Sequence, residues 1–365
     1  MGQFAPLSVL GLMSGTSMDG VDGAMLVTDG ETISEFGPSA FRPFTAAEAA
    51  ALVAAQGLWP GEDAKKLSAA GQVVFESHRS LVDEFDGVEL LGFHGQTLAH
   101  DPDAGRTHQL GDGNALAEAT GIGTVWDFRS ADMAAGGQGA PLAPFFHWAC
   151  ARWAGLTGPV AFLNLGGVGN VTIVDPAAER PELPGALLAF DTGPANAPLN
   201  DLMMARFGQP FDENGRLAAS GEVDEAIISR IFQRDYFSKQ APKSLDRHDF
   251  HDALDLVRDL SDADAAATLT ALPAACVVAN LNHLSGVADQ WYICGGGAQN
   301  PTMMRELANR LPGRVVPVEE IGLDGEMLEA QAFAYLAVRK LRNLPISAPG
   351  TTGCNAPTVG GQISP

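Results

Sequence analysis

Cysteine is scarce in this chain, and its four cysteines, Cys150, Cys276, Cys294 and Cys354, lie far apart without a CxxC pair. This spacing argues against a zinc cage or a disulfide framework and favours free thiols in a reducing cytoplasm. Basic residues are also few, since 22 Lys and Arg stand against 44 Asp and Glu, a formal net charge of -22. Phosphate-rich surfaces repel such a chain, so we expect neither nucleic acid nor an anionic membrane as a partner.

Long hydrophobic runs and two common nucleotide motifs are missing as well. No run of 18 apolar residues occurs, and the N-terminus lacks the basic stretch of a secretory signal, so we expect a cytoplasmic protein. The pattern GxxxxGK[ST] is absent, which disfavours a P-loop enzyme. Neither GGVGNVT nor GGGAQN completes GxGxxG, which makes a nicotinamide dehydrogenase a remote alternative.

The chain is long enough for two domains, since 365 residues exceed one comfortable core. Strand-like and helix-like segments alternate, which predicts an α/β fold. We place the first domain at residues 1–128 and the second at 129–344. The tail, about 345–365, shows no periodicity and either is partly disordered or packs back on the first domain.

Apolar periodicity and capping residues predict the individual elements. Thr45 and Asp112 are expected to cap helices, Pro273 to interrupt one, and residues 127–141 to form an adaptable loop. Strands are expected at 90–93, 122–126 and 186–190, and helices at 45–56, 62–85, 112–120, 141–153, 197–207, 222–233, 251–260, 263–288 and 326–344.

The first candidate site is a hairpin, VLGLMSGTSMDGVDGAMLV, in which two apolar runs flank a tip rich in Gly, Ser and Thr. Small residues let backbone N–H groups approach an anion closely, and Thr16 and Ser17 add donors. Asp19 and Asp22 would repel a bare triphosphate, so they would face it through Mg2+ and its waters. A plain Gly- and Asp-rich turn is the equally weighted alternative.

Two further segments repeat this pattern. AFLNLGGVGNVTIV places Gly166, Gly167 and Gly169 with Asn170 between two strands. WYICGGGAQNP runs from a strand through glycines 295–297 into a helix. Gly-rich hairpins on separate halves of the chain suggest a duplicated architecture that closes on a nucleotide.

Polar groups follow several strands, where α/β proteins place their chemistry. Asp191 is a candidate general base beside a phosphoryl donor, or alternatively only a helix cap. Arg129 carries a donor fork suited to a carboxylate, with a surface ion pair as the alternative. His94 and Gln96 could bind a sugar-like ligand or serve the structure. A patch of Lys243, Ser244 and Arg247 contacts the nucleotide or substrate, or is a solvated loop.

At this point the motifs match a family. MSGTSMDGVD, FHGQT, WDFR, NLGGVGNVT, FDTGPAN, PKSxxR and CGGGAQNP occur in order over nearly the whole chain, which resembles the anhydro-N-acetylmuramic acid kinases. The resemblance implies a two-domain actin-like fold, a duplicated ribonuclease H-like architecture whose central interdomain cleft closes on ATP. It also implies a bacterial homodimer that acts on a small amino sugar with ATP and Mg2+ as cofactors.

The implied reaction opens the 1,6-anhydro ring of anhydro-N-acetylmuramic acid with water and phosphorylates the freed O6. Asp191 would take the proton from water. Arg129 and Glu329 would contact the sugar, with His94 and Gln96 as weaker assignments, and Asp19 and Asp22 would meet the metal through water. The nucleotide contacts carried over are Gly15, Thr16, Ser17, Met18, Asp19, Gly20, Val21, Asp22, Gly166, Gly167, Gly169, Asn170, Gly295, Gly296 and Gly297.

One departure from the family pattern and two alternatives stay open. Members often read Asp-Pro-Asp before the EA pair, whereas this chain has Asp324, Gly325 and Glu326, which leaves the role of Glu326 undecided. A kinase of an ordinary amino sugar would share the hairpins and need only a hydroxyl deprotonated by Asp191. A chaperone or filament ATPase would need a peptide-binding domain or polymer contacts, and no such domain follows the last helix.

Overall fold

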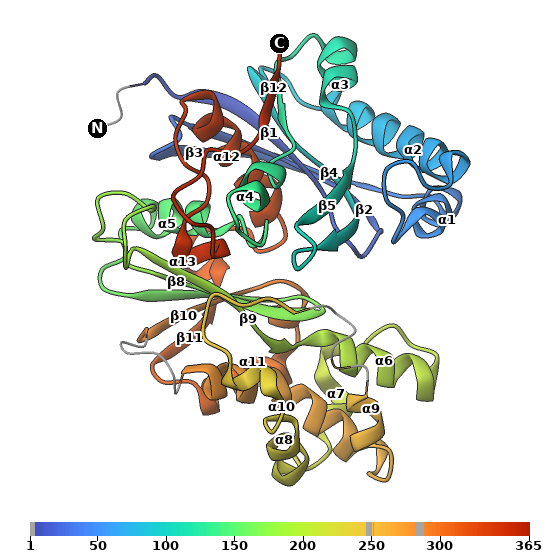
Figure 1. The fold of residues 1–365 in the computed structure, drawn as a ribbon. Helices are drawn as coiled ribbons and strands as arrows, with labels where there is room; N and C mark the ends of the chain where they lie inside the picture. Colours follow the sequence, from blue (N-terminus) through green and yellow to red (C-terminus); the bar gives the residue numbers. More distant parts are fainter. Residues whose placement is uncertain (1–3, 246–249, 251, 282–287) are drawn as a thin grey trace. The chain divides into compact units, whose positions relative to one another are not determined.

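The computed structural model describes residues 4–245, 250, 252–281 and 288–365, which form two compact units (Figure 1). The first unit comprises Met1–Trp153, Glu179–Pro184 and Met327–Pro365, and the second comprises Ala154–Ala178 and Gly185–Glu326. The break therefore falls after residue 153 instead of 128, and the last long helix belongs to the first unit. Arg247 and His251, named among the expected features, lie outside the described residues.

The sheet of the first unit has the order β12-β6-β4-β1-β2-β3, with β5 paired to β4. Strands β1, β2 and β3 form an antiparallel meander, β4 runs parallel to β1, and β6 runs parallel to β4. The bounds are β1 Leu7–Ser14, β2 Gly20–Thr28, β3 Ile33–Pro43, β4 Leu90–Asp101, β5 Arg106–Leu110, β6 Thr124–Trp126 and β12 Gln362–Ser364.

The sheet of the second unit has the order β11-β10-β7-β8-β9. Strands β7, β8 and β9 again form an antiparallel meander, β10 runs parallel to β7, and β11 runs parallel to β10. The bounds are β7 Val160–Leu165, β8 Val168–Val174, β9 Leu187–Pro194, β10 Gln290–Cys294 and β11 Arg314–Pro317. Three antiparallel strands followed by two parallel ones thus occur twice, which confirms the expected duplicated ribonuclease H-like, actin-like fold.

Helices cover the first sheet, and two predicted caps are confirmed. Thr45 forms a capping box with Glu48, and Asp112 accepts hydrogen bonds from the N–H groups of Asn114 and Ala115. The expectation of a loop over residues 127–141 is wrong in part, because this segment contains a short helix, α4. The helices are α1 Ala46–Ala55, α2 Ala64–Val82, α3 Gly113–Thr120, α4 Ser130–Ala134, α5 Pro144–Trp153, α12 Leu328–Leu341 and α13 Pro349–Thr352.

Helix α12 lies directly against the first sheet, where glycines on two strands make room for its backbone. A Cβ on Gly11 would lie 1.8 Å from the Ala330 carbonyl oxygen, and one on Gly92 would lie 2.2 Å from the Phe333 oxygen. No side chain fits such an approach, so Gly is required at both positions. The C-terminal tail joins the same unit, because β12 pairs antiparallel with β6.

The second unit contains the helices around its own core, and one sequence expectation about them is wrong. Helix α10, Asp262–Leu281, continues through Pro273 without a break. Most of its side chains are buried, so packing outweighs the lost N–H of the proline. The others are α6 Asn196–Phe207, α7 Arg216–Ala219, α8 Glu225–Ile231, α9 Ala253–Leu256 and α11 Pro301–Arg310, with 3-10 turns η1 Glu213–Gly215, η2 Asp235–Ser238, η4 Gly296–Gln299 and η5 Val318–Ile321.

By length and composition α10 could also cross a membrane, a test that core helices of soluble proteins pass as well. Within the protein, 83% of its most apolar 18-residue window is buried. Its apolar surface is therefore used in packing against the rest of the second unit.

Candidate active site

The tip of the β1–β2 hairpin presents unpaired backbone donors. Thr16 and Ser17 are exposed, and their N–H groups make no hydrogen bond within the part of the chain that the structure describes. The tip is anchored from below by Met18, whose side chain is buried and whose N–H donates to the Gly15 oxygen at 3.2 Å. Ser17 donates its hydroxyl to Asp19 at 2.7 Å. Such an arrangement leaves donors ready for an anion.

The glycines of this hairpin serve two different purposes. A Cβ on Gly20 would lie 2.4 Å from the Phe41 ring, so packing alone requires glycine there. A Cβ on Gly15 would meet nothing closer than the Ser17 hydroxyl at 3.5 Å, and Gly15 has no positive φ. The fold itself does not require glycine at position 15, which fits the close approach of a ligand.

Gln96 supports this hairpin from strand β4. Its side-chain oxygen accepts from the Ser14 hydroxyl at 2.6 Å, and its amide nitrogen donates to the Gly15 oxygen at 3.0 Å. The residue is completely buried. The structure therefore gives Gln96 a positioning role under the tip, and both ends of its amide are used within the chain instead of facing a sugar.

The β7–β8 hairpin of the second unit is built in the same way. The carbonyl groups of Gly166 and Gly167 accept from the start of α6, Asn196 N–H at 2.9 Å and Ala195 N–H at 3.0 Å. The N–H groups of the two glycines make no hydrogen bond within the described residues. A Cβ on Gly166 would have space, since its nearest neighbour is the Val168 oxygen at 3.5 Å. At Gly166 this tip too has a donor without a partner among the described residues and no packing that demands glycine, whereas a Cβ on Gly169 would lie 2.7 Å from the Thr192 hydroxyl oxygen.

The third glycine segment is mostly structural. Gly295 has φ +74, and a Cβ there would lie 2.2 Å from the Asn164 side-chain oxygen. A Cβ on Gly297 would lie 2.5 Å from Leu165. Only Gly296 is open, with the Asn196 amide at 3.6 Å. Because β10 pairs with β7, this turn lies at the same end of the sheet as the β7–β8 hairpin.

Asp191 lies beside that hairpin on β9, directly across from Asn170 in the β8–β9 register. Its Oδ2 accepts from the Leu245 N–H at 2.8 Å, and its Oδ1 has no hydrogen-bond partner among the described residues. Burial raises the pKa of Asp191 to about 7, against the opposing effect of the Leu245 N–H. A carboxylate with one free oxygen and a pKa near neutrality suits a general base.

Lys243 holds the segment that contacts Asp191. Its carbonyl oxygen accepts from the Asp191 N–H at 2.9 Å, and its Nζ donates to the Tyr236 oxygen at 2.9 Å. Tyr236 in turn donates its hydroxyl to the Asp191 carbonyl oxygen. Lys243 is buried, and burial lowers its pKa to about 8. The alternative of a solvated loop is therefore wrong at Lys243, because its side chain points into the interior. Lys243, Tyr236 and Asp191 are joined in a closed set of hydrogen bonds.

In the first unit the half-buried Arg129 and the buried His94 form a hydrogen-bonded pair. The Nδ1 of His94 lies 2.8 Å from the Gly95 carbonyl oxygen, and its Nε2 accepts from Arg129 Nε at 3.2 Å and from a terminal nitrogen at 3.0 Å. These partners assign the proton to Nδ1. Burial, and then the Arg129 charge, lower the pKa of His94 well below its ordinary value, so the ring is neutral. His94 holds Arg129 in place and is not a proton donor to a substrate.

Arg129 keeps unused donors. Its other partner among the described residues is the Gly139 carbonyl oxygen at 2.7 Å, so the three bonds leave two of the five guanidinium N–H groups. Burial lowers the pKa of Arg129 to about 10, while the carboxylates of Glu329 and Asp132 oppose this shift. The guanidinium is charged at neutral pH and can bind an anion. Glu329, exposed in the first turn of α12, is close enough to act on that charge.

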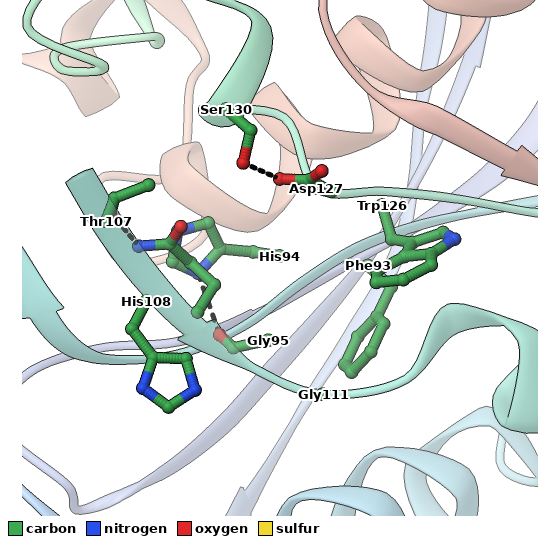
Figure 2. A pocket seen from close by; sticks show the side chains of 10 residues that line it. Phe93, His94, Gly95, Thr107, His108, Gly111, Trp126, Asp127 and Ser130 are labelled. Atoms are coloured by element: carbon green, nitrogen blue, oxygen red, sulfur yellow. Dashed lines mark hydrogen bonds between the residues drawn. The ribbon is translucent and has the colours of Figure 1, made fainter. Parts of the chain in front are cut away.

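A pocket of about 110 Å³ lies next to this pair, within the first unit (Figure 2). Phe93 and Trp126 supply aromatic rings, and Asp127 and Ser130 supply oxygens. Asp127 has φ +52, an uncommon conformation for a residue with a side chain, and accepts hydrogen bonds from Ser130 and from Gln362. Aromatic walls with oriented polar groups suit part of a sugar.

No cluster of three or more His, Cys, Asp or Glu side chains that could hold a metal occurs among the described residues. Asp19 is exposed at the first tip and Asp22 lies half-buried on β2. Mg2+ is usually bound through one or two carboxylates, waters and substrate phosphates, so this donor set fits a metal that arrives with a nucleotide. It does not fit a resident metal centre.

Three supporting residues were missed by the sequence reasoning: Tyr236, Leu245 and Asp132. The first two hold Asp191, and the third supports the Arg129 loop. Leu245 acts through its backbone and Tyr236 through a distant carbonyl, so neither leaves a signal of its own. Only the neighbouring motif PKSxxR pointed to this part of the chain.

The comparisons with known proteins agree with the motifs. The family model of anhydro-N-acetylmuramic acid kinase matches residues 7–365. The anhydro-N-acetylmuramic acid kinase of Cereibacter sphaeroides is 60% identical over 97% of this chain and 95% of that protein, and that of Roseobacter denitrificans is 54% identical over 98% and 94%. Among solved structures, the activator of the 2-hydroxyisocaproyl-CoA dehydratase from Clostridium difficile has a TM-score of 0.46 at 14% identity over 92% of this chain and 96% of that chain, which is too distant to carry an argument. The family match and the close relatives show that this chain belongs to the anhydro-N-acetylmuramic acid kinase family.

Proposed function

We propose that this protein is an ATP-dependent kinase that opens the 1,6-anhydro ring of anhydro-N-acetylmuramic acid with water and phosphorylates O6. The products are N-acetylmuramic acid 6-phosphate and ADP. The observation that carries the proposal is Asp191, whose pKa is raised to about 7 and which lies across from Asn170 of a hairpin with free N–H groups. A base and phosphate donors in one unit are what phosphoryl transfer coupled to hydrolysis needs.

In the proposed reaction Asp191 acts through Oδ1, which has no partner among the described residues, while the Leu245 N–H holds Oδ2. Oδ1 takes a proton from water as the water oxygen attacks the anomeric carbon. The bond between that carbon and O6 breaks, and its electron pair stays on O6. The bridging oxygen is thereby freed to attack the γ-phosphorus of ATP, and ADP leaves. The proton on Asp191 passes to solvent after the transfer, so the sugar, water and ATP are the three reactants and the carboxylate is regenerated.

The two hairpin tips would hold the phosphates. Thr16 and Ser17 of the first unit and Gly166 and Gly167 of the second offer unpaired N–H groups, and the small residues let phosphate oxygens approach them. Gly296 is the open position of the third segment and the candidate for a contact with the rest of the nucleotide. Mg2+, when bound through Asp19 or Asp22 and the phosphates, would reduce the charge repulsion between them.

Arg129 and its neighbours would bind the sugar. Muramic acid carries a lactyl carboxylate, and the two free N–H groups of Arg129 match such a group. In a chain with net charge -22, an anionic substrate needs a dedicated cation of this kind. Glu329 would accept from sugar hydroxyl groups, and the aromatic pocket beside His94 would take a less polar part of the ring or its acetamido group.

ADP release with a panel of sugars tests this proposal. Purified protein with Mg2+ and ATP is expected to turn over 1,6-anhydro-N-acetylmuramic acid but neither N-acetylmuramic acid nor N-acetylglucosamine. Turnover of the plain sugars instead would assign the chain to an ordinary amino-sugar kinase, and no turnover with any sugar would reject both. A cytoplasmic homodimer, implied by the resemblance, stays a prediction that sedimentation analysis can test.

A further inference from the structure

The C-terminal tail contacts the Arg129 loop through one buried carboxylate. Asp132, in helix α4, is completely buried. Its Oδ1 accepts from the hydroxyl groups of Ser347 and of Thr352, the latter at 2.6 Å, and its Oδ2 accepts from the Gly139 N–H at 2.7 Å. Three donors thus converge on a carboxylate that shares no surface with water, and two of them come from residues more than 200 positions away.

Gly139 transmits this contact to Arg129. Its N–H is held by Asp132, and its carbonyl oxygen accepts from Arg129 at 2.7 Å. These two bonds fix the orientation of the peptide groups on either side of Gly139. Glycine is needed at this position because its φ is +71 and because a Cβ there would lie 2.8 Å from the Met133 side chain. Any movement of the Asp132 carboxylate would turn the carbonyl group that orients the guanidinium.

The same tail fixes the rest of the loop by backbone bonds. The Gln138 N–H donates to the Thr352 oxygen at 2.8 Å, and the Asn355 N–H donates to the Ala135 oxygen at 2.9 Å. A Cβ on Gly137 would lie 2.2 Å from Asp132 Oδ2, so glycine is needed for the carboxylate to enter. The loop has no regular structure of its own after α4, and these contacts replace it.

We propose that Asp132, Ser347 and Thr352 are positioning residues that set the specificity of the site for a carboxylate-bearing sugar by orienting Arg129 through Gly139. The inference rests on the proposed function, because it assumes that Arg129 binds the lactyl carboxylate. His94 fixes one side of the guanidinium and Gly139 the other, so both are needed to aim its two free N–H groups. The tail is then part of the substrate site without contacting the substrate.

The test compares Thr352→Val with Thr351→Val. Both threonines are buried in α13, but the Thr351 hydroxyl bonds only Ala348 of the tail, whereas the Thr352 hydroxyl bonds Asp132. The two threonine variants are assayed together with two further single variants, Asp132→Asn and Arg129→Lys. Each protein is given 1,6-anhydro-N-acetylmuramic acid and, separately, 1,6-anhydro-N-acetylglucosamine, which lacks the lactyl carboxylate. Calorimetric Kd without nucleotide and kcat/KM with ATP are measured for both sugars.

We expect Thr352→Val to weaken binding of the muramic acid roughly three- to tenfold, less than the full value of a hydrogen bond to a charged group because Thr352 acts on Arg129 indirectly, and to leave the glucosamine sugar and kcat unchanged. Asp132→Asn should act in the same direction, and Thr351→Val should change neither sugar. Equal losses for both sugars, or equal effects of the two threonine variants, would overturn the inference. A wild-type protein that fails to prefer the muramic acid would overturn the proposed role of Arg129 and this inference with it.

Discussion

The two units share one strand order but place different side chains beside their hairpins. Each has a β-hairpin with one glycine that the fold does not require, Gly15 in the first and Gly166 in the second. In the first unit β4 carries the buried, neutral His94, which accepts from the half-buried cation Arg129 after β6. In the second the neighbouring strand leads to Asp191, a carboxylate of raised pKa. Under the proposed function both duplicated hairpins would bind phosphate, and the residues on and after the adjacent strands would divide substrate binding from base catalysis.

The largest expected effect removes the base of the second unit. Asp191→Asn should lower kcat about 10³-fold, since general bases contribute roughly 10²- to 10⁴-fold, with little change in KM for either substrate. Steady-state ADP release measures this. Asp175→Asn is the matched control, a half-buried carboxylate of the same unit whose partner within the described part of the chain is the Ala177 N–H at 3.0 Å, and it should leave kcat unchanged. Retained turnover in the Asp191 variant would place the base elsewhere.

A second variant addresses the cation of the first unit. Arg129→Lys keeps the charge but loses the fork that His94 and Gly139 hold, so KM for the sugar should rise on the order of 100-fold while kcat changes little. Arg106→Lys, an exposed arginine of the same unit that pairs with Asp101, serves as the control. A fall in kcat at unchanged KM would contradict the division of labour, because it would give Arg129 a role in the chemical step.

The hairpin glycines test whether both units bind the nucleotide. Gly15→Ala and Gly166→Ala should each raise KM for ATP about tenfold while the melting temperature stays the same or rises slightly, because Ala fits both sites and restricts the unfolded chain. Gly20→Ala, which would lie 2.4 Å from Phe41, should instead destabilise the protein. An effect on ATP from only one hairpin would show that duplication kept phosphate binding in one unit alone.

The last expected effect is on folding stability and leaves the division between the two units untouched. The pKa of Asp191 is about 7 in the folded protein, above its ordinary value of 3.8, so ionising it costs folding free energy as the pH rises from about 4 to 7. At pH 8 Asp191→Asn should therefore be more stable by about 1–4 kcal/mol, and this gain should vanish below about pH 3, where the carboxyl is protonated in both states. Denaturant unfolding at the two pH values measures it, and a gain that does not depend on pH would contradict the raised pKa.

Local elements were largely predictable because their signals are local. Thr45 and Asp112 cap helices as their neighbours in sequence indicated, and the three glycine segments fall at strand ends. The expected interruption at Pro273 was wrong, because burial of the surrounding helix outweighs the backbone hydrogen bond that the proline removes. The limits of the two units were also out of reach, since they depend on α12 packing against β1 and β4 through Gly11 and Gly92.

The candidate site residues could likewise be predicted where their signal was local, and not where it depended on distant partners. Asp191 and Arg129 could be named from their place after a strand and their chemistry. The sequence could not tell that His94 is neutral or that Gln96 is buried under Gly15, because both facts depend on partners distant in sequence. The sequence also could not distinguish Gly15 and Gly166, where a Cβ would have space, from Gly295 and Gly297, where a Cβ would clash with neighbouring atoms.

By itself the sequence determined the α/β character, the two glycine hairpins and, through its motifs, the kinase family, because composition, periodicity and turn chemistry act over a few neighbouring residues. Only the tertiary structure decided which groups are ready for chemistry. Burial raises the pKa of Asp191, and hydrogen bonds to His94 and Gly139 orient Arg129. The loop that contains Gly139 is held by the C-terminal tail, which lies more than 200 residues away in the sequence. Burial and long-range hydrogen bonds exist only once the chain has folded.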